Sequence, residues 1–320
     1  METVIVIGML VARRHAAALL VAPLLLAGCS GGADDVSAPP SDAPACPTTP
    51  LDVVVSVDQW GDIVSELGGA CTNVRTLLAS SSVDPHDYEP SPADAARVED
   101  ARLVVVNGGH YDEWATKLAA GSASNAPVVD AVAIGDPSYD ERGGGNPHVW
   151  YRPDTVAAVA DAVTAELAEL SPAAGDYFAE RRNAFSVDTR PYHDLITAIK
   201  EGAAGRTYAA TETVFDGMAA AVGLQDRTPA GYRAAAQNES DPSPGDLDAF
   251  LGLLRGKGVD VLIYNTQTEG SVPEQIRSAA ESAGVAVVEV TETVAPGADS
   301  FEAWQVRQLT SLAEALGVQA

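Results

Sequence analysis

The chain has 320 residues, of which 19 are basic and 45 acidic, and its formal net charge is −26. A surface this acidic repels phosphate backbones, and no basic run exceeds two residues, so we expect no nucleic-acid partner. The hydrophobic fraction of 46% is too high for a disordered chain, and the length allows two domains that each have their own core.

The first 28 residues have the pattern of a secretory signal peptide. Arg13 and Arg14 precede an apolar stretch over residues 16–27, which is too short to span a bilayer. The stretch ends in LAGC at residues 26–29, which resembles the lipobox of bacterial lipoproteins, where the cysteine is lipidated. We therefore predict that Cys29 anchors the protein to the outer face of the bacterial cell membrane. The alternative is a plain signal peptide followed by an incidental cysteine.

Residues 29–48 are rich in Gly, Ser, Asp and Pro, and we predict that they form a lipidated, flexible tether. Two further cysteines, Cys46 and Cys71, would meet an oxidising compartment after export, where a disulfide between them is the default expectation. Each precedes a predicted strand, so the two would lie side by side if those strands are parallel neighbours. The alternatives are two unpaired thiols, or a cysteine pair that binds metal without a second pair to complete the site.

The rest of the chain alternates short apolar runs with helical patterns. Buried strands are predicted over residues 51–57, 74–78, 103–107, 126–129, 206–211, 259–264 and 285–290. Helical periodicity fills the intervals between them, and this alternation predicts parallel sheets. Between the fourth and fifth strands the spacing of apolar residues indicates a long helix with a bend at Pro191.

The predicted fold is therefore α/β, with two lobes, each a parallel-stranded sheet flanked by helices, joined by one long backbone helix. In chain order we expect a lipoprotein signal peptide (residues 1–28) and a tether (29–48). An N-terminal lobe (49–172), a linking helix (173–201) and a C-terminal lobe (202–320) follow. Ligands of such proteins bind in the crevice at the carboxyl ends of the strands.

Two histidines follow prolines in loops at this predicted crevice. His86 lies in DPHDYEP after the second strand, and His148 lies in NPHVW after the fourth. A single histidine is more often structural or merely exposed to solvent. Two in matching X-Pro-His loops favour a metal site, because imidazole is the commonest ligand for a divalent metal of intermediate softness.

These loops resemble a known family. SSSVDPHDYEPSPAD, ARLVVVNGGHYDEW and NPHVWYRP, together with the lipobox, are similar to the zinc- and manganese-binding lipoproteins of ABC importers, cluster A-I of the solute-binding proteins. The likeness extends over nearly the whole mature chain. In that family two histidines come from the first lobe, a His or Glu from the start of the second lobe, and an Asp or Glu from a position near the last strand.

The resemblance implies a set of metal ligands in this chain. His86 and His148 match the first two positions, and Glu212 falls at the third, where many relatives have histidine. At the fourth position the family's aspartate aligns with Thr291, which offers no anionic oxygen, so we expect the next residue, Glu292, to be the ligand. Glu212 could instead serve the first turn of a helix, and Glu292 could be a surface carboxylate.

The resemblance also implies the function. We expect an extracytoplasmic receptor that binds one divalent transition metal ion, Mn²⁺ or Zn²⁺ with Fe²⁺ as a third candidate, between its lobes and delivers it to the ABC permease subunit. The membrane, through Cys29, is the other expected partner, and we expect a monomer. A metal-dependent hydrolase and a surface adhesin are the alternatives. We expect no enzymatic activity, because the sequence has neither a His-Glu-x-x-His nor a Gly-x-Ser-x-Gly motif.

Overall fold

The computed structural model describes residues 44–79, 85–86, 88–122, 125–137, 139, 145–238, 240–268, 270–295 and 297–319. The predicted signal peptide, Cys29 and most of the predicted tether lie outside the described residues. Within the described ranges, no helix is both long enough and apolar enough to cross a membrane.

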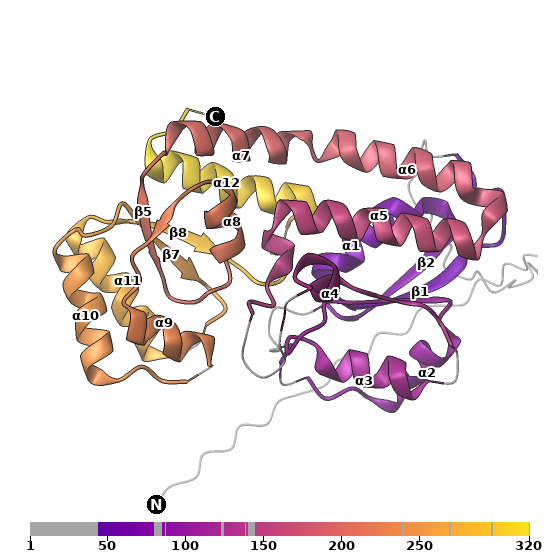
Figure 1. The fold of residues 1–320 in the computed structure, drawn as a ribbon, viewed down its shortest axis with the longest axis horizontal. Helices are drawn as coiled ribbons and strands as arrows, with labels where there is room; N and C mark the ends of the chain where they lie inside the picture. Colours follow the sequence, from indigo (N-terminus) through magenta and orange to yellow (C-terminus); the bar gives the residue numbers. More distant parts are fainter. Residues whose placement is uncertain are drawn as a thin grey trace, which may run out of the picture. The chain divides into compact units, whose positions relative to one another are not determined.

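The N-terminal lobe is built on a four-stranded parallel sheet in the order β2-β1-β3-β4 (Figure 1). Its strands are β1 (Leu51–Val57), β2 (Thr72–Leu78), β3 (Leu103–Val106) and β4 (Val128–Asp130). The central strands β1 and β3 are rich in valine and buried, as expected for strands covered on both faces. The helices of this lobe are α1 (Asp58–Gly68), α2 (Pro92–Asp100), α3 (Glu113–Gly121), α4 (Ala131–Gly135) and α5 (Pro153–Leu170).

The C-terminal lobe repeats this arrangement around a second parallel sheet in the order β6-β5-β7-β8. Its strands are β5 (Thr207–Ala210), β6 (Gln225–Asp226), β7 (Val261–Asn265) and β8 (Ala286–Val290). Its helices are α8 (Asp216–Ala221), α9 (Ala230–Gln237), α10 (Pro244–Arg255), α11 (Ser271–Ala283) and α12 (Phe301–Leu316). The α/β class with two parallel sheets is thus confirmed.

The seven predicted strands form, with ends shifted by at most two residues. Strand β6 was not predicted, because its two residues are exposed and polar and therefore leave no apolar run in the sequence. Helices α4 and α9 were also missed. Both are short, with 5 and 8 residues, which is too little for helical periodicity to stand out.

The predicted linking helix consists of two successive helices, α6 (Gly175–Asp188) and α7 (Arg190–Gly202), with Thr189 between them. They follow one another along one edge of the molecule, and α12 runs beside α7 (Figure 1). Pro191 is near the start of α7, where a proline costs no helical hydrogen bond, so the interruption falls where the bend was predicted. Helix α12 also contacts α1 of the first lobe.

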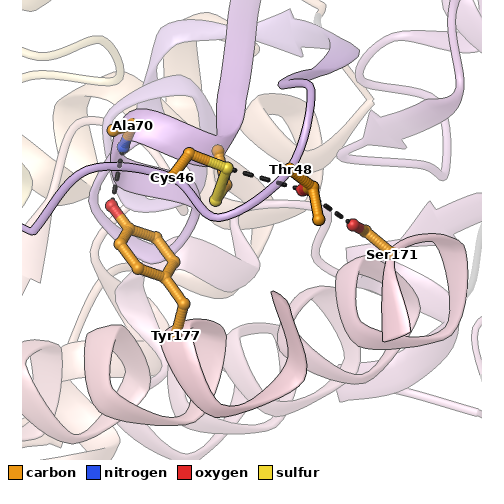
Figure 2. The surroundings of a disulfide bond; sticks show 6 residues. Cys46, Thr48, Ala70, Ser171 and Tyr177 are labelled. Atoms are coloured by element: carbon orange, nitrogen blue, oxygen red, sulfur yellow. Dashed lines mark hydrogen bonds between the residues drawn. A yellow bond between two sulfur atoms is a disulfide. The ribbon is translucent and has the colours of Figure 1, made fainter. Parts of the chain in front are cut away.

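A disulfide joins Cys46 to Cys71, as predicted. Strands β1 and β2 are parallel neighbours with Leu51 opposite Thr72, so the segments that precede them enter the sheet side by side. Figure 2 shows the neighbouring contacts: the Thr48 and Ser171 hydroxyls lie 3.0 Å apart, and the Ala70 amide donates to the Tyr177 hydroxyl at 2.8 Å. The disulfide therefore links the segments that precede β1 and β2, beside the end of α5 and the start of α6.

An acidic cluster lies where α1 meets α12. Asp62, Glu66 and Glu302 each place a carboxylate oxygen within 4.8 Å of the others. Burial, followed by the charges of Glu302 and Asp62, raises the pKa of Glu66 to about 8. Burial also raises the pKa of Asp62. A carboxyl group whose pKa is raised on folding destabilises the folded state when it is ionised, so this cluster opposes folding in alkaline solution.

Glu66→Gln is therefore expected to raise the melting temperature, by at least about 2 °C in mildly alkaline buffer. The gain should be absent below about pH 4.5, grow as the pH rises, and be complete above about pH 8, since these are the unfolded and folded pKa values of Glu66. Thermal unfolding at several pH values checks this, with the exposed Glu180→Gln on α6 as the control. A gain independent of pH would contradict it.

Candidate metal site

The four predicted ligands lie in loops or turns. His86 comes after β2, Glu212 follows β5, and Glu292 follows β8. His148 comes after helix α4 and directly precedes a 3-10 helix, Val149–Tyr151, that leads into α5. Because the carboxyl ends of parallel strands meet at one edge of a sheet, the three ligands that follow strands lie at such edges.

The His148 ring is oriented by Asn146. The Asn146 Oδ1 atom accepts from the backbone amide of His148 at 3.0 Å and lies 2.7 Å from His148 Nδ1. Since Oδ1 is an acceptor, Nδ1 carries the proton, and the lone pair of the ring is on Nε2. Nε2 lies 3.9 Å from Glu292 Oε2 of the other lobe. Asn146 also contacts that lobe, because its Nδ2 donates to the Thr213 carbonyl at 2.6 Å.

His86 is oriented in the same way. Its Nδ1 lies 3.2 Å from the His110 carbonyl oxygen, which can only accept, so Nδ1 is again the protonated nitrogen. The buried ring of Tyr111 packs edge-on against both imidazoles, with centroid distances of 5.1 Å to His86 and 5.8 Å to His148. One rigid aromatic side chain thus sets the spacing of the two histidines.

The two carboxylates meet at Asn265, the buried last residue of β7. Asn265 Nδ2 donates to Glu212 Oε2 at 2.6 Å and to Glu292 Oε1 at 2.9 Å. The backbone of Glu292 is also held: Gln59 Nε2 of α1 donates to its carbonyl at 2.7 Å, and its amide donates to Gln267 Oε1 at 2.6 Å. The contact from Gln59 crosses between the lobes.

Thr291, the position that aligns with the family's aspartate, is turned away from this cluster. Its hydroxyl accepts from Trp304 Nε1 at 2.9 Å and donates to the Thr293 carbonyl at 2.8 Å. Glu289, a nearby acidic residue on β8, pairs with Arg277 at 2.6 Å. Among these neighbours, Glu292 is therefore the acidic residue that meets Glu212 and His148.

Burial, with a smaller contribution from the charge of His86, lowers the pKa of His148 to about 3. The ring is therefore neutral at physiological pH, which is the form that binds metals. Burial and the nearby charge of Glu292 raise the pKa of Tyr111, so its hydroxyl stays protonated. Imidazole nitrogens and carboxylate oxygens are both donors that suit a divalent cation.

Sequence reasoning missed the side chains that hold these four residues. Asn146 stands in the Asn-Pro-His motif but was assigned no role, and Tyr111 was not singled out. Gln59 and Asn265 occur within a helix and at the end of a strand that gave no sign of a site. Gln59 contacts Glu292 across a sequence separation of 233 residues, and Asn265 contacts Glu212 across a separation of 53. No local sequence pattern encodes contacts of this kind.

Two α/β lobes, with two predicted histidine ligands in one and two predicted carboxylate ligands in the other, have the organisation of a two-lobed solute-binding protein for a metal cation. Residues 53–315 match the family described as zinc-uptake complex component A, periplasmic, and the chain belongs to this family of metal-binding proteins of ABC importers.

Individual relatives are distant but align over most of their length. The chain is 24% identical over 294 residues to the manganese-binding lipoprotein MntA of Halalkalibacterium halodurans, covering 88% of this chain and 91% of that protein. It is 22% identical over 217 residues to the high-affinity zinc uptake system protein ZnuA of Bacillus subtilis, covering 63% and 67%. The solved structure of FpvC from Pseudomonas aeruginosa with Mn²⁺ superposes with a TM-score of 0.68 at 20% identity, covering 84% and 99%.

Proposed function

We propose that the protein is the extracytoplasmic receptor of an ABC importer, and that it captures a divalent transition metal ion with His86, His148, Glu212 and Glu292. The observation that supports this proposal best is the inter-lobe contact of His148 Nε2 with Glu292 Oε2, with Glu212 joined to Glu292 through Asn265. His148, Glu292 and Glu212 come from three separate loops, and His86 packs against the same Tyr111 ring as His148. Imidazole and carboxylate are ligands that Zn²⁺ and Mn²⁺ accept.

The ion would connect the two lobes, since both histidines come from the first lobe and both carboxylates from the second. Relatives support a transported metal as the ligand, because MntA is named as manganese-binding and ZnuA as part of a zinc uptake system. On this proposal the protein acts as a monomer, is held at the membrane by a lipid on Cys29, and releases the ion to the permease subunit.

The proposal does not include catalysis. A catalytic zinc site keeps one position for water beside three protein ligands, whereas here the protein supplies four donors. The family consists of metal-binding transport proteins. An adhesin role appears in the names of two solved structures of a laminin-binding protein of Streptococcus agalactiae, each 22% identical, and a likeness at this level shows the fold alone.

Elemental analysis of protein exported by its native host under metal limitation tests the proposal. We expect one Zn²⁺ or Mn²⁺ per chain, and a melting temperature that falls on chelation and recovers when the metal returns, because a ligand that binds only the folded state stabilises it. Mg²⁺, which prefers oxygen ligands, is the control and should leave the melting temperature unchanged. Protein that retains no transition metal and gains no stability from Zn²⁺ or Mn²⁺ would contradict the proposal.

A further inference from the structure

The side chain of Asn265 donates a hydrogen bond to each of the two candidate carboxylates. The residue is 2% exposed, so water cannot replace these bonds freely. Left alone, Glu212 and Glu292 would repel each other at such proximity, and the amide between them compensates part of this repulsion.

The orientation of this amide is determined by a third contact. Asn265 Oδ1 accepts from the backbone amide of Gln267 at 3.1 Å, and a backbone N–H can only donate. Oδ1 and Nδ2 are therefore assigned unambiguously, and both hydrogens of Nδ2 point toward the carboxylates. An asparagine amide has two hydrogens to donate, so its donor capacity is used by Glu212 and Glu292.

This arrangement engages one oxygen of each carboxylate. Asn265 holds Oε2 of Glu212 and Oε1 of Glu292, while the other oxygen of Glu292 faces His148 Nε2. An oxygen that accepts a short hydrogen bond is a weaker metal donor, so each carboxylate is biased toward binding through its other oxygen. Together with one nitrogen from each histidine, this gives four donor atoms.

We propose that Asn265 is a specificity-determining residue, which favours Zn²⁺ over Mn²⁺ by restraining both carboxylates to one-oxygen binding. The inference rests on the proposed function, since it assigns a cargo preference to the same site. Zn²⁺ is stable with four ligands in tetrahedral geometry, whereas Mn²⁺ is typically found with six. If each carboxylate supplies only one oxygen, the coordination number of the metal ion stays low.

The test measures Zn²⁺ and Mn²⁺ affinities of the metal-free wild type and of Asn265→Leu, a variant of similar side-chain volume without donors. Without the Asn265 donor, each carboxylate is less restrained from binding through both oxygens, so the ratio of Zn²⁺ to Mn²⁺ affinity is expected to fall at least about tenfold, in the range that ligand-supporting residues show. X-ray absorption of the Zn²⁺ forms should give four donor atoms for the wild type and more for the variant.

Asn146→Leu is the matched control, because it removes an amide that supports a histidine and contacts neither carboxylate side chain in the described interactions. It should weaken both metals in parallel and leave the ratio unchanged. An unchanged ratio in Asn265→Leu, or an equal shift in both variants, would overturn the inference while leaving the proposed function intact. A wild type that binds neither metal would instead refute the proposed function. If Asn265→Leu does not fold, Asn265→Ser, which offers one donor, is measured against the same criteria.

Discussion

Replacing His148 with alanine is expected to lower the affinity for Zn²⁺ by more than about a hundredfold, because the variant loses a donor itself and not merely a group that supports one. The ring is neutral at physiological pH and its Nε2 lies 3.9 Å from Glu292 Oε2, so it is already arranged for binding. Glu212→Ala is expected to weaken binding strongly for the same reason. Calorimetric titration with Zn²⁺ measures both effects.

The folded structure should survive these substitutions, because neither His148 nor Glu212 belongs to the buried apolar core, which includes Trp60, Trp150 and Phe215. Far-ultraviolet circular dichroism and the melting temperature of the metal-free proteins check this. His193→Ala is the control, since His193 is an exposed histidine on α7 away from the four predicted ligands. Wild-type affinity in His148→Ala would remove His148 from the site.

Of the substitutions proposed, those that remove the Cys46–Cys71 bond should lower the free energy of unfolding most. The bond joins residues 25 apart in sequence, and restricting a loop of this size in the unfolded chain stabilises the folded state by about 3 kcal/mol on the chain-entropy estimate. Cys46→Ser/Cys71→Ser should therefore unfold at a temperature lower by about 6 °C or more. Thermal and urea unfolding of the metal-free protein provide the measurement.

Chemical reduction of the disulfide provides an internal control. It should lower the free energy of unfolding of the wild type to that of the double serine variant, and it should leave the variant unchanged. Metal affinity should remain unchanged in both, since the bond lies at the amino ends of β1 and β2 and the site lies beyond the carboxyl ends of the strands. Two alkylated thiols in the exported, denatured and unreduced protein would show that the bond is not formed.

Much of the fold follows from local pattern. The strand LDVVVSV is apolar over its whole length and is bounded by a helix that starts at Asp58, so β1 was predicted with its observed ends. Pro92 after Ser91 is typical of a helix start, and α2 begins there, where the Ser91 side chain accepts from the Asp94 amide. In contrast, β6 has no such pattern, and it exists because Thr207 and Tyr208 of β5 provide an edge to pair with.

The candidate site likewise has a part that the sequence predicts and a part that it does not. His86 and His148 stand out because X-Pro-His occurs twice in a chain with 5 histidines, and that is a property of the sequence. Whether Thr291 or Glu292 is the fourth ligand does not follow from a count of residue types. In the structure Thr291 bonds Trp304 while Glu292 bonds Asn265, and these contacts favour the prediction of Glu292 as the ligand.

By itself, the sequence determined the α/β class, the parallel sheets, the cysteine pair and the two histidine loops, because each depends on residues that are near one another in the chain or on a count of residue types. Only the tertiary structure decided which groups support the ligands. Gln59, Asn146 and Asn265 act through hydrogen bonds, several of them between residues far apart in the sequence, and a hydrogen bond depends on distance and direction in space. Those quantities exist only once the chain has folded.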